Sequence, residues 1–218
     1  MAPVSAQAPA SQRIGRLLER LAQAYPRARC SLKFSTPLEL LVATILSAQC
    51  TDAQVNRVTA TLFNTYRTAE DYAFAPLASL TRDLARVNFF RTKAKHIQGA
   101  CRLLVERFQG TVPPRMKDLL QLPGVARKTA NVVLGNAFHV NAGIVVDTHV
   151  LRLSRRLGLT AHHDRDKIEQ DLMALVPPRR WTVFSHRLIA HGRAVCTANA
   201  PACGSCPLGK TLCPSYQP

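Results

Sequence analysis

The stretch from Leu122 to His149 constrains the fold of this chain more strongly than any other part of the sequence. It opens with a Pro-Gly turn between two apolar residues, and the residues that follow, 127–137, contain no proline and fit a helix. The first backbone N–H groups of a helix have no partner within the helix and carry the positive end of its dipole. A glycine turn that leads into a helix start therefore predicts a binding place for a phosphate, with Lys128 beside it.

An aspartate, Asp147, lies near the end of the same stretch and precedes an apolar-periodic run that includes Val150 and Leu157. This pattern predicts a helix with Asp147 as its N-cap. The short apolar run at 143–146 is interpreted as buried loop rather than strand. On these residues alone, a lysine that only contacts phosphate and an aspartate that only caps a helix are favoured over a catalytic pair.

Four of the seven cysteines are concentrated at the C-terminal end, in the order Cys-x6-Cys-x2-Cys-x6-Cys. Core packing does not explain this density, and four thiolates in one short segment are typical of a metal site. Either tetrahedral zinc or an iron–sulfur cluster fits the spacing. The other three are interpreted as ordinary small core or surface residues. The residues are Cys196, Cys203, Cys206 and Cys213 in the metal-site pattern, and Cys30, Cys50 and Cys101 outside it.

The charge balance indicates a polyanionic partner. The 218 residues include 29 Lys and Arg against 13 Asp and Glu, which gives a net charge of +16, and 47% are hydrophobic, enough for a substantial core. A basic ribosomal or structural protein is the alternative that charge alone leaves open. No apolar run approaches the roughly 20 residues that cross a bilayer. Residues 1–12 are interpreted as a disordered tail rather than a secretory signal, so we expect an intracellular protein without membrane contact.

Nearly all of the remaining sequence fits helices, which predicts an all-α fold. The clearest helix start has Thr36 as N-cap, Pro37 at the first position and Glu39 in a capping box. The helix that follows is apolar nearly all round and must be buried. Further helices are expected over residues 14–25, from Thr51, Thr68, Thr81 and Thr92, and over residues 116–120, 164–176 and 182–191.

The hairpin stretch, the segment STPLELLVATILSAQCTD at 35–52 and the C-terminal cysteines occur together in one group of DNA repair enzymes. In these features the chain resembles the helix-hairpin-helix DNA glycosylases related to endonuclease III, from about Ile14 to Cys213. The resemblance implies two helical lobes with a DNA-binding groove between them. One is a six-helix domain with the hairpin motif at 30–140, and the other is a cluster domain made of 1–29 and 141–218.

The resemblance also implies roles for individual residues. Lys128 matches the nucleophile of the family, Asp147 its catalytic partner, and the four C-terminal cysteines the ligands of a [4Fe–4S] cluster. The sequence departs from the family pattern at three places. Ala126 stands where the second hairpin glycine is usual, the loop before Asp147 is about one residue longer, and so is the gap before Cys213.

The implied activity is that of a bifunctional DNA glycosylase and abasic-site lyase of base excision repair, acting as a monomer on damaged or abasic duplex DNA. An unprotonated lysine can displace an oxidised pyrimidine, form an imine with the sugar and promote strand cleavage by β-elimination. The alternatives are a related glycosylase for a mispaired or photodamaged base and a non-catalytic DNA-binding protein.

Flipping a base out of the duplex leaves a gap in the stack that a side chain can fill. The resemblance assigns this role to Gln49 and to a wedge loop at 87–90, with Val87 and Phe89 in contact with DNA. Burial of one of the two adjacent phenylalanines is the alternative for Phe89. Further DNA contacts are expected from the hairpin at Leu122, Gly124, Ala126 and Arg127, and from Arg91, Lys93 and Lys95, because residues 197–202 carry no charge.

Overall fold

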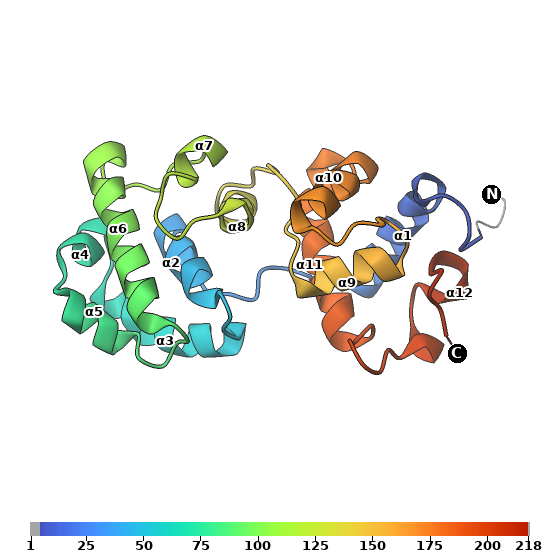
Figure 1. Ribbon diagram of the computed structural model, residues 1–218, viewed down its shortest axis with the longest axis horizontal. Helices are drawn as coiled ribbons and strands as arrows, with labels where there is room; N and C mark the ends of the chain where they lie inside the picture. The colour runs from blue at the N-terminus through green and yellow to red at the C-terminus, as the bar shows by residue number, and fades with distance from the viewer. Residues whose placement is uncertain (1–4, 218) are drawn as a thin grey trace. The chain divides into compact units, whose positions relative to one another are not determined.

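The computed structural model describes residues 5–217, and every regular element within them is a helix, which confirms the all-α prediction. Among the described residues, no helix combines the length and the apolar character that spanning a bilayer requires. Figure 1 shows the helices in chain order. Their bounds are α1 (Ala10–Ala24), α2 (Pro37–Ser47), α3 (Asp52–Thr65), α4 (Ala69–Phe74), α5 (Leu77–Asp83), α6 (Phe90–Phe108), α7 (Met116–Leu119), α8 (Arg127–Ala137), α9 (Thr148–Arg156), α10 (Arg165–Leu175), α11 (Trp181–Ala194) and α12 (Gly209–Leu212), with 3-10 turns at Pro178–Arg180 and Cys203–Ser205.

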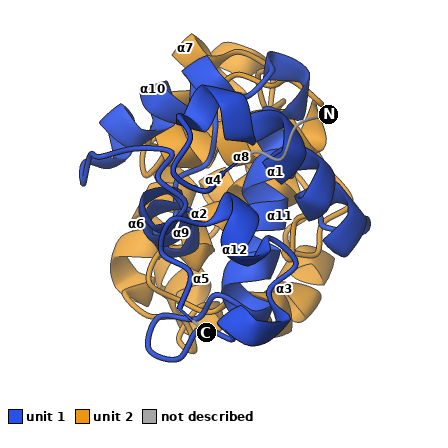
Figure 2. Cartoon of the chain, turned by 90° about the vertical axis from the view of Figure 1, so that its right-hand side faces the viewer, with its two compact units in different colours: residues 1–29, 143–218 blue, residues 30–142 orange. Residues whose placement is uncertain are grey.

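The chain divides into two compact units, coloured separately in Figure 2. Unit 1 consists of residues 1–29 and 143–218, and unit 2 consists of residues 30–142. Each unit has its own hydrophobic core. The N-terminal helix is therefore part of the same core as the C-terminal segment.

Unit 2 is built around α2, which lies between α6 and α8 in Figure 1 and also packs against α3. Its residues 40–46 are all buried, because its apolar side chains surround the helix. Each fully buried leucine contributes roughly 1.5–3 kcal/mol relative to an exposed one. The predicted start is confirmed: the Thr36 hydroxyl accepts from Glu39 N at 3.2 Å, and Pro37 occupies the first position.

A second layer of unit 2 is formed by α4 against α6. Thr68 caps α4 in a complete capping box with Asp71, and the backbone N–H groups of Thr68 and Arg67 hold the pKa of Asp71 below its usual value. The amide of Gln98, on α6, donates to Ala75 O at 2.8 Å, just after α4 ends. The short helix is therefore fixed at both ends.

Unit 1 packs α1, α9, α10 and α11 around a core that includes Phe184. Its N-terminal helix is held by Arg13, which is buried at 2% exposure. The guanidinium donates to Leu157 O at 2.8 Å, Leu212 O at 2.9 Å, Gly158 O at 3.2 Å and Ala8 O at 2.7 Å. A charged donor thus joins the start of α1 to the end of α9 and to α12.

Three expectations about helix boundaries were wrong. Thr81 lies inside α5, which begins at Leu77 after Pro76, and α6 begins at Phe90 rather than near Thr92. Ala10 to Gln12 form the first turn of α1 instead of the end of a disordered tail, while residues 1–4 lie outside the described residues. Neither α5 nor α6 has a side-chain cap, so the local signal on which these expectations depended is missing there.

Candidate active site and cysteine centre

The Pro-Gly turn of unit 2 has the geometry of an anion site. Val125 N donates to Leu122 O at 3.1 Å and closes the turn, and Gly124 has φ +78°, in the left-handed region. A Cβ at Gly124 would lie 2.8 Å from His96 Cβ, so glycine is required there. Ala126 then enters α8 in an extended conformation and offers no side-chain cap. No N-cap side chain therefore accepts from the first N–H groups of α8. In α2, α3 and α4, by contrast, a threonine side chain does so.

Lys128 is the second residue of α8 and is exposed. Arg127 and Ala126, which precede it, are exposed as well. The turn thus presents backbone donors and the amine of Lys128 at the same end of one helix. This is the arrangement that the sequence predicts within residues 122–137.

Asp147 belongs to unit 1, where it caps α9 as predicted. Its Oδ1 accepts from Val150 N at 2.8 Å, and its backbone is extended at φ −92° and ψ −171°. The preceding run at 143–146 is buried loop, and Val145 N donates to the Ser185 hydroxyl at 3.1 Å. The cap uses one carboxylate oxygen, Oδ1, of a half-exposed side chain.

Gln49 and Phe89 stand on two turns of unit 2 that are joined to each other. The side-chain amide of Asn88 donates to Gln49 O at 2.7 Å. Both residues have left-handed backbones, with φ 53° at Gln49 and φ 57° at Phe89. For residues other than glycine this conformation costs roughly 1–2 kcal/mol, and such strain is concentrated at functional sites. Phe89 is 62% exposed, so burial of this ring is excluded.

Lys93 corrects one expectation about DNA contacts. Its side chain is buried, and its ammonium donates to Leu46 O at 2.7 Å and to Ala48 O at 2.6 Å. These carbonyls end α2, where a cation is favoured by the helix dipole. Lys93 is therefore not a surface cation for duplex DNA but supports the turn that carries Gln49. Arg91, by contrast, is exposed and lies over the Phe90 ring, 4.6 Å from its centroid.

Val87 and Leu122 are both 2% exposed. Their side chains belong to the core of unit 2, so they can meet a ligand only through their backbone atoms. Val87 N donates to Leu84 O and Leu122 N donates to Leu119 O, which fixes the two turns on which Phe89 and Gly124 stand. The two residues therefore position the exposed parts of the site.

The four C-terminal cysteines are brought together in unit 1. They line one cavity of about 280 Å³, between the ends of α9 and α11 and the segment that contains α12. Within the described residues, no three His, Cys, Asp or Glu side chains are arranged to hold a single metal ion. Four sulfur donors around one cavity are a donor set that both a zinc ion and an iron–sulfur cluster use. Elsewhere, burial raises the pKa of the Cys101 thiol to about 12, as expected for a core cysteine.

Two residues that sequence reasoning missed or gave only a packing role surround this cavity. Arg156 donates to Cys196 Sγ at 3.3 Å and to Thr197 O and Ala198 O. His191 Nε2 lies 3.6 Å from Cys206 Sγ, and its Nδ1 is 2.9 Å from the Tyr25 hydroxyl. Burial lowers the pKa of His191 to about 4, so the ring is neutral at pH 7 and can accept from the tyrosine while donating to sulfur. No sequence signal distinguishes Arg156 from the other arginines of α9.

Comparisons with known proteins agree with this architecture. Residues 42–178 match the HhH-GPD superfamily of base excision DNA repair proteins. Endonuclease III of Synechocystis sp. is 56% identical over 206 residues, which are 94% of each chain. Endonuclease III of Bacillus subtilis is 48% identical over 192 residues, which are 88% of this chain and 87% of the relative. A solved non-covalent endonuclease III–DNA complex gives a TM-score of 0.89 at 45% identity, covering 94% of this chain and 96% of that one.

The helical fold and the hairpin turn define a base excision repair protein of the HhH-GPD superfamily. The matches in sequence and structure place it further. The chain belongs to the endonuclease III family, and it is a DNA glycosylase with abasic-site lyase activity.

Proposed function

We propose that the enzyme releases oxidised pyrimidines from duplex DNA, with Lys128 as nucleophile and Asp147 as its partner. The observation that carries this proposal is an exposed lysine one residue inside α8, next to an uncapped helix start, in a chain of the endonuclease III family. A phosphate bound by the N–H groups of that helix start would place the neighbouring sugar beside the amine. Duplex DNA is thus the partner, as it is in the solved endonuclease III–DNA complexes.

The chemistry follows from an amine and a carboxylate. The unprotonated Lys128 Nζ attacks C1′, the bond from C1′ to the base breaks, and the base leaves with the electron pair and takes up a proton. Ring opening then gives an imine between Nζ and C1′. Loss of a C2′ proton breaks the bond from C3′ to oxygen, so the strand is cleaved by β-elimination. Asp147 stabilises positive charge at the sugar and accepts a proton through the oxygen that the α9 cap does not use.

Gln49 and Phe89 are proposed to occupy the gap that the flipped nucleotide leaves. Both are exposed, and their turns are joined through Asn88 and supported by Lys93. An aromatic ring can stack on the neighbouring bases, and a glutamine can donate to and accept from an unpaired base. Both residues have left-handed backbones, a strained conformation of the kind that clusters at functional sites.

The four cysteines that line the unit 1 cavity are proposed to hold a [4Fe–4S] cluster. Bound there, the cluster supplies structural cross-links between the end of α11 and the segment that follows it. Arg156 places positive charge next to the thiolate of Cys196, and His191 donates toward Cys206. Unit 1 is then the cluster domain, and unit 2 is the helix-hairpin-helix domain.

Borohydride trapping tests the catalytic proposal. Wild type, Lys128→Ala and Lys33→Ala are incubated with duplexes that contain thymine glycol, an abasic site, a mispaired thymine or no lesion. We expect a covalent adduct with thymine glycol and with the abasic site for wild type and Lys33→Ala, and none for Lys128→Ala. An adduct of equal yield in Lys128→Ala would overturn the nucleophile assignment. A higher adduct yield with the mispaired thymine than with thymine glycol would show that the substrate is a mispaired base rather than an oxidised pyrimidine.

Iron and acid-labile sulfide contents test the cluster proposal. We expect about four iron and four sulfide per chain in protein purified without oxygen. Cys206→Ser should lower both contents, whereas Cys50→Ser, which changes a cysteine of unit 2 outside the cavity, should not. A stoichiometric zinc content with no sulfide would show that the four cysteines hold a different metal.

A further inference from the structure

A second cavity, of about 380 Å³, lies in unit 2 between α3 and the end of α5. Both helices lie at the lower edge of unit 2 in Figure 1. We call this cavity the arginine pocket. Its polar lining consists of Gln54, Arg57, Thr61, Arg82, Asp83 and Arg86.

The charge of the arginine pocket is strongly positive. Three arginines and one carboxylate, that of Asp83, line it, and a single carboxylate cannot balance three guanidinium groups. Asp83 Oδ2 also accepts from the Tyr66 hydroxyl at 2.8 Å, so it is partly used within the unit. Among the described residues, Arg57, Arg82 and Arg86 form no ion pair within 4.0 Å. The described part of the protein therefore does not balance the positive charge of this pocket, and an external anion could do so.

The kind of anion follows from the donors. A guanidinium group presents its N–H donors in a planar fork that matches the oxygens of a phosphate, and several arginines together are typical of phosphate recognition. All three arginines are exposed, so the pocket is open to a phosphate that is part of a larger molecule. Gln54 and Thr61 add neutral polar groups at its wall.

The pocket is joined directly to the turns that carry Gln49 and Phe89. The side-chain amide of Gln54 donates to Arg86 O at 3.0 Å, and Arg86 precedes Phe89 by three residues. The amide of Asn88 in turn donates to Gln49 O. A duplex with Gln49 and Phe89 in its stack would therefore pass the pocket with its phosphate backbone.

We propose that the arginine pocket binds a backbone phosphate of the duplex, outside the lesion itself, through Arg57, Arg82 and Arg86. This inference rests on the proposed placement of Gln49 and Phe89 in DNA. It adds a contact in unit 2 that is separate from the hairpin turn. It also gives a function to three arginines whose side chains make only one hydrogen bond with the described residues, a long contact of Arg82 with the Ser79 hydroxyl at 3.4 Å.

Salt-dependent binding tests the proposal. Affinity for an abasic-site-analogue duplex is measured from low to high salt for wild type, Arg57→Gln, Arg86→Gln and the double variant. The matched control is Arg67→Gln, an exposed arginine beyond the opposite end of α3 from Gln49. Each phosphate contact contributes roughly 0.9 to the slope of log affinity against log salt, which corresponds to about eightfold in affinity at 0.1 M salt relative to 1 M. We expect the pocket variants to lose slope and affinity by up to this amount and Arg67→Gln to lose neither.

The outcomes separate this proposal from the function on which it rests. Unchanged slopes in both pocket variants, with wild type still forming a borohydride adduct, would overturn the pocket alone. Absence of the adduct in wild type would overturn the proposed catalytic function whatever the slopes are. A third measurement is titration with inorganic pyrophosphate in the absence of DNA. If wild type binds pyrophosphate tightly, both pocket variants lose this binding and the DNA slopes are unchanged, the pocket is a site for a free phosphate compound and the DNA contact is overturned.

Discussion

Replacing Gly124 by alanine tests whether the hairpin turn is as rigid as its contacts indicate. A left-handed backbone costs an alanine roughly 1–2 kcal/mol relative to glycine, and Gly124 has φ +78°. The new Cβ would also lie 2.8 Å from His96 Cβ, which is bonded directly to the backbone of α6 and cannot rotate away. Overpacking of this kind costs typically about 1–3 kcal/mol. The expected loss of unfolding free energy is therefore about 2–5 kcal/mol.

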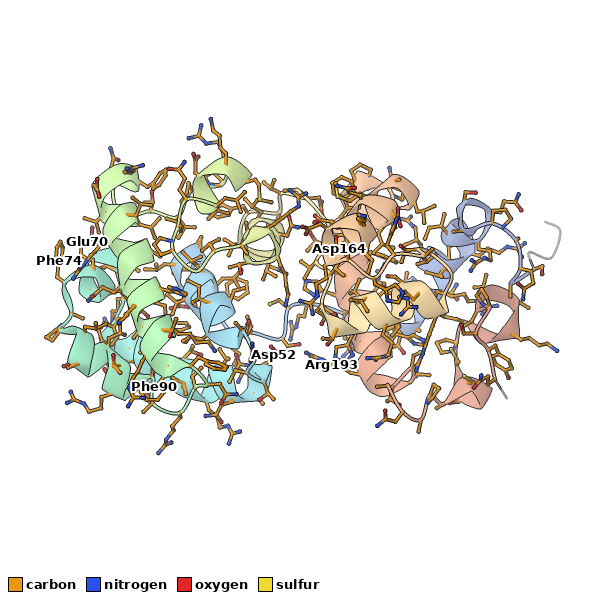
Figure 3. The ribbon with its side chains drawn as sticks, viewed as in Figure 1. Asp52, Glu70, Phe74, Phe90, Asp164 and Arg193 are labelled. Carbon is orange, nitrogen blue, oxygen red and sulfur yellow. The ribbon has the colours of Figure 1, made fainter. Side chains whose placement is uncertain are left out.

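Gly110→Ala is the matched control, because it imposes the same strain without the rigid neighbour. Gly110 has φ +74°, and a Cβ there would meet Glu70 Oε1 at 2.7 Å. Glu70 is exposed on α4, at the edge of unit 2 in Figure 3, so its carboxylate can turn into solvent. Only the left-handed penalty of roughly 1–2 kcal/mol remains.

Urea unfolding measures the stability of both variants. We expect the free energy of unfolding of Gly124→Ala to be about 1–3 kcal/mol lower than that of Gly110→Ala. Duplex affinity adds a functional readout. Gly124→Ala should weaken binding, because the turn must shift to relieve the contact with His96, whereas Gly110→Ala should leave it unchanged. Equal losses of stability in the two variants would refute the reasoning, since the contact with His96 Cβ would then cost nothing.

Three further predictions concern stability. Arg13→Met should lower the free energy of unfolding in urea by roughly 3 kcal/mol or more, because it leaves buried carbonyls of unit 1 without their charged donor. Arg20→Met, on the exposed face of α1, should lower it little. Similar losses in the two variants would contradict the role of Arg13. Gly15→Ala should stabilise by up to about 1 kcal/mol, since no atom lies within 4 Å of the new Cβ inside α1; a lower melting temperature would disprove this. Asp71→Ala should lose about 1 kcal/mol of capping at pH 7. Because the folded pKa of Asp71 is lowered, its contribution is present above its unfolded value of about 3.9 and is lost as the pH falls through the folded pKa. The difference between the two proteins in unfolding scans should therefore shrink as the pH falls below that unfolded value, and a constant difference would refute the assignment.

The parts of the fold that were predictable are those that local chemistry determines. Thr36, Thr51 and Thr68 each accept from a backbone N–H three residues later, as their sequence context predicts, and Asp147 does the same at α9. These caps involve only neighbouring residues, so no knowledge of packing is needed. The same holds for the cysteines, because three short gaps limit how far the four sulfurs can separate.

The parts that were not predictable depend on contacts between distant segments. Phe89 precedes α6 as its N-cap residue with φ 57°, a conformation that its residue type disfavours. Phe90, labelled in Figure 3, is the first residue of that helix. Lys93 reads as a surface cation beside a loop, yet the carbonyls at the end of α2 lie within its reach. The arginine pocket combines α3 with the end of α5, and no spacing in the sequence relates Arg57 to Arg86.

The net charge of +16 therefore overstates what is available to DNA. Arg13, Lys93 and Arg156 direct their charged groups to backbone carbonyls inside the units, where they stabilise helix ends and the segment at 197–198. Only cations that approach phosphates release counterions and contribute to salt dependence. The segment at 197–202 carries no charge, so any cations of unit 1 that contact DNA must come from elsewhere in that unit. In unit 2, two groups of exposed cations are well placed to contact phosphates: Lys128 with Arg127 at the hairpin, and the three arginines next to the turns of Gln49 and Phe89.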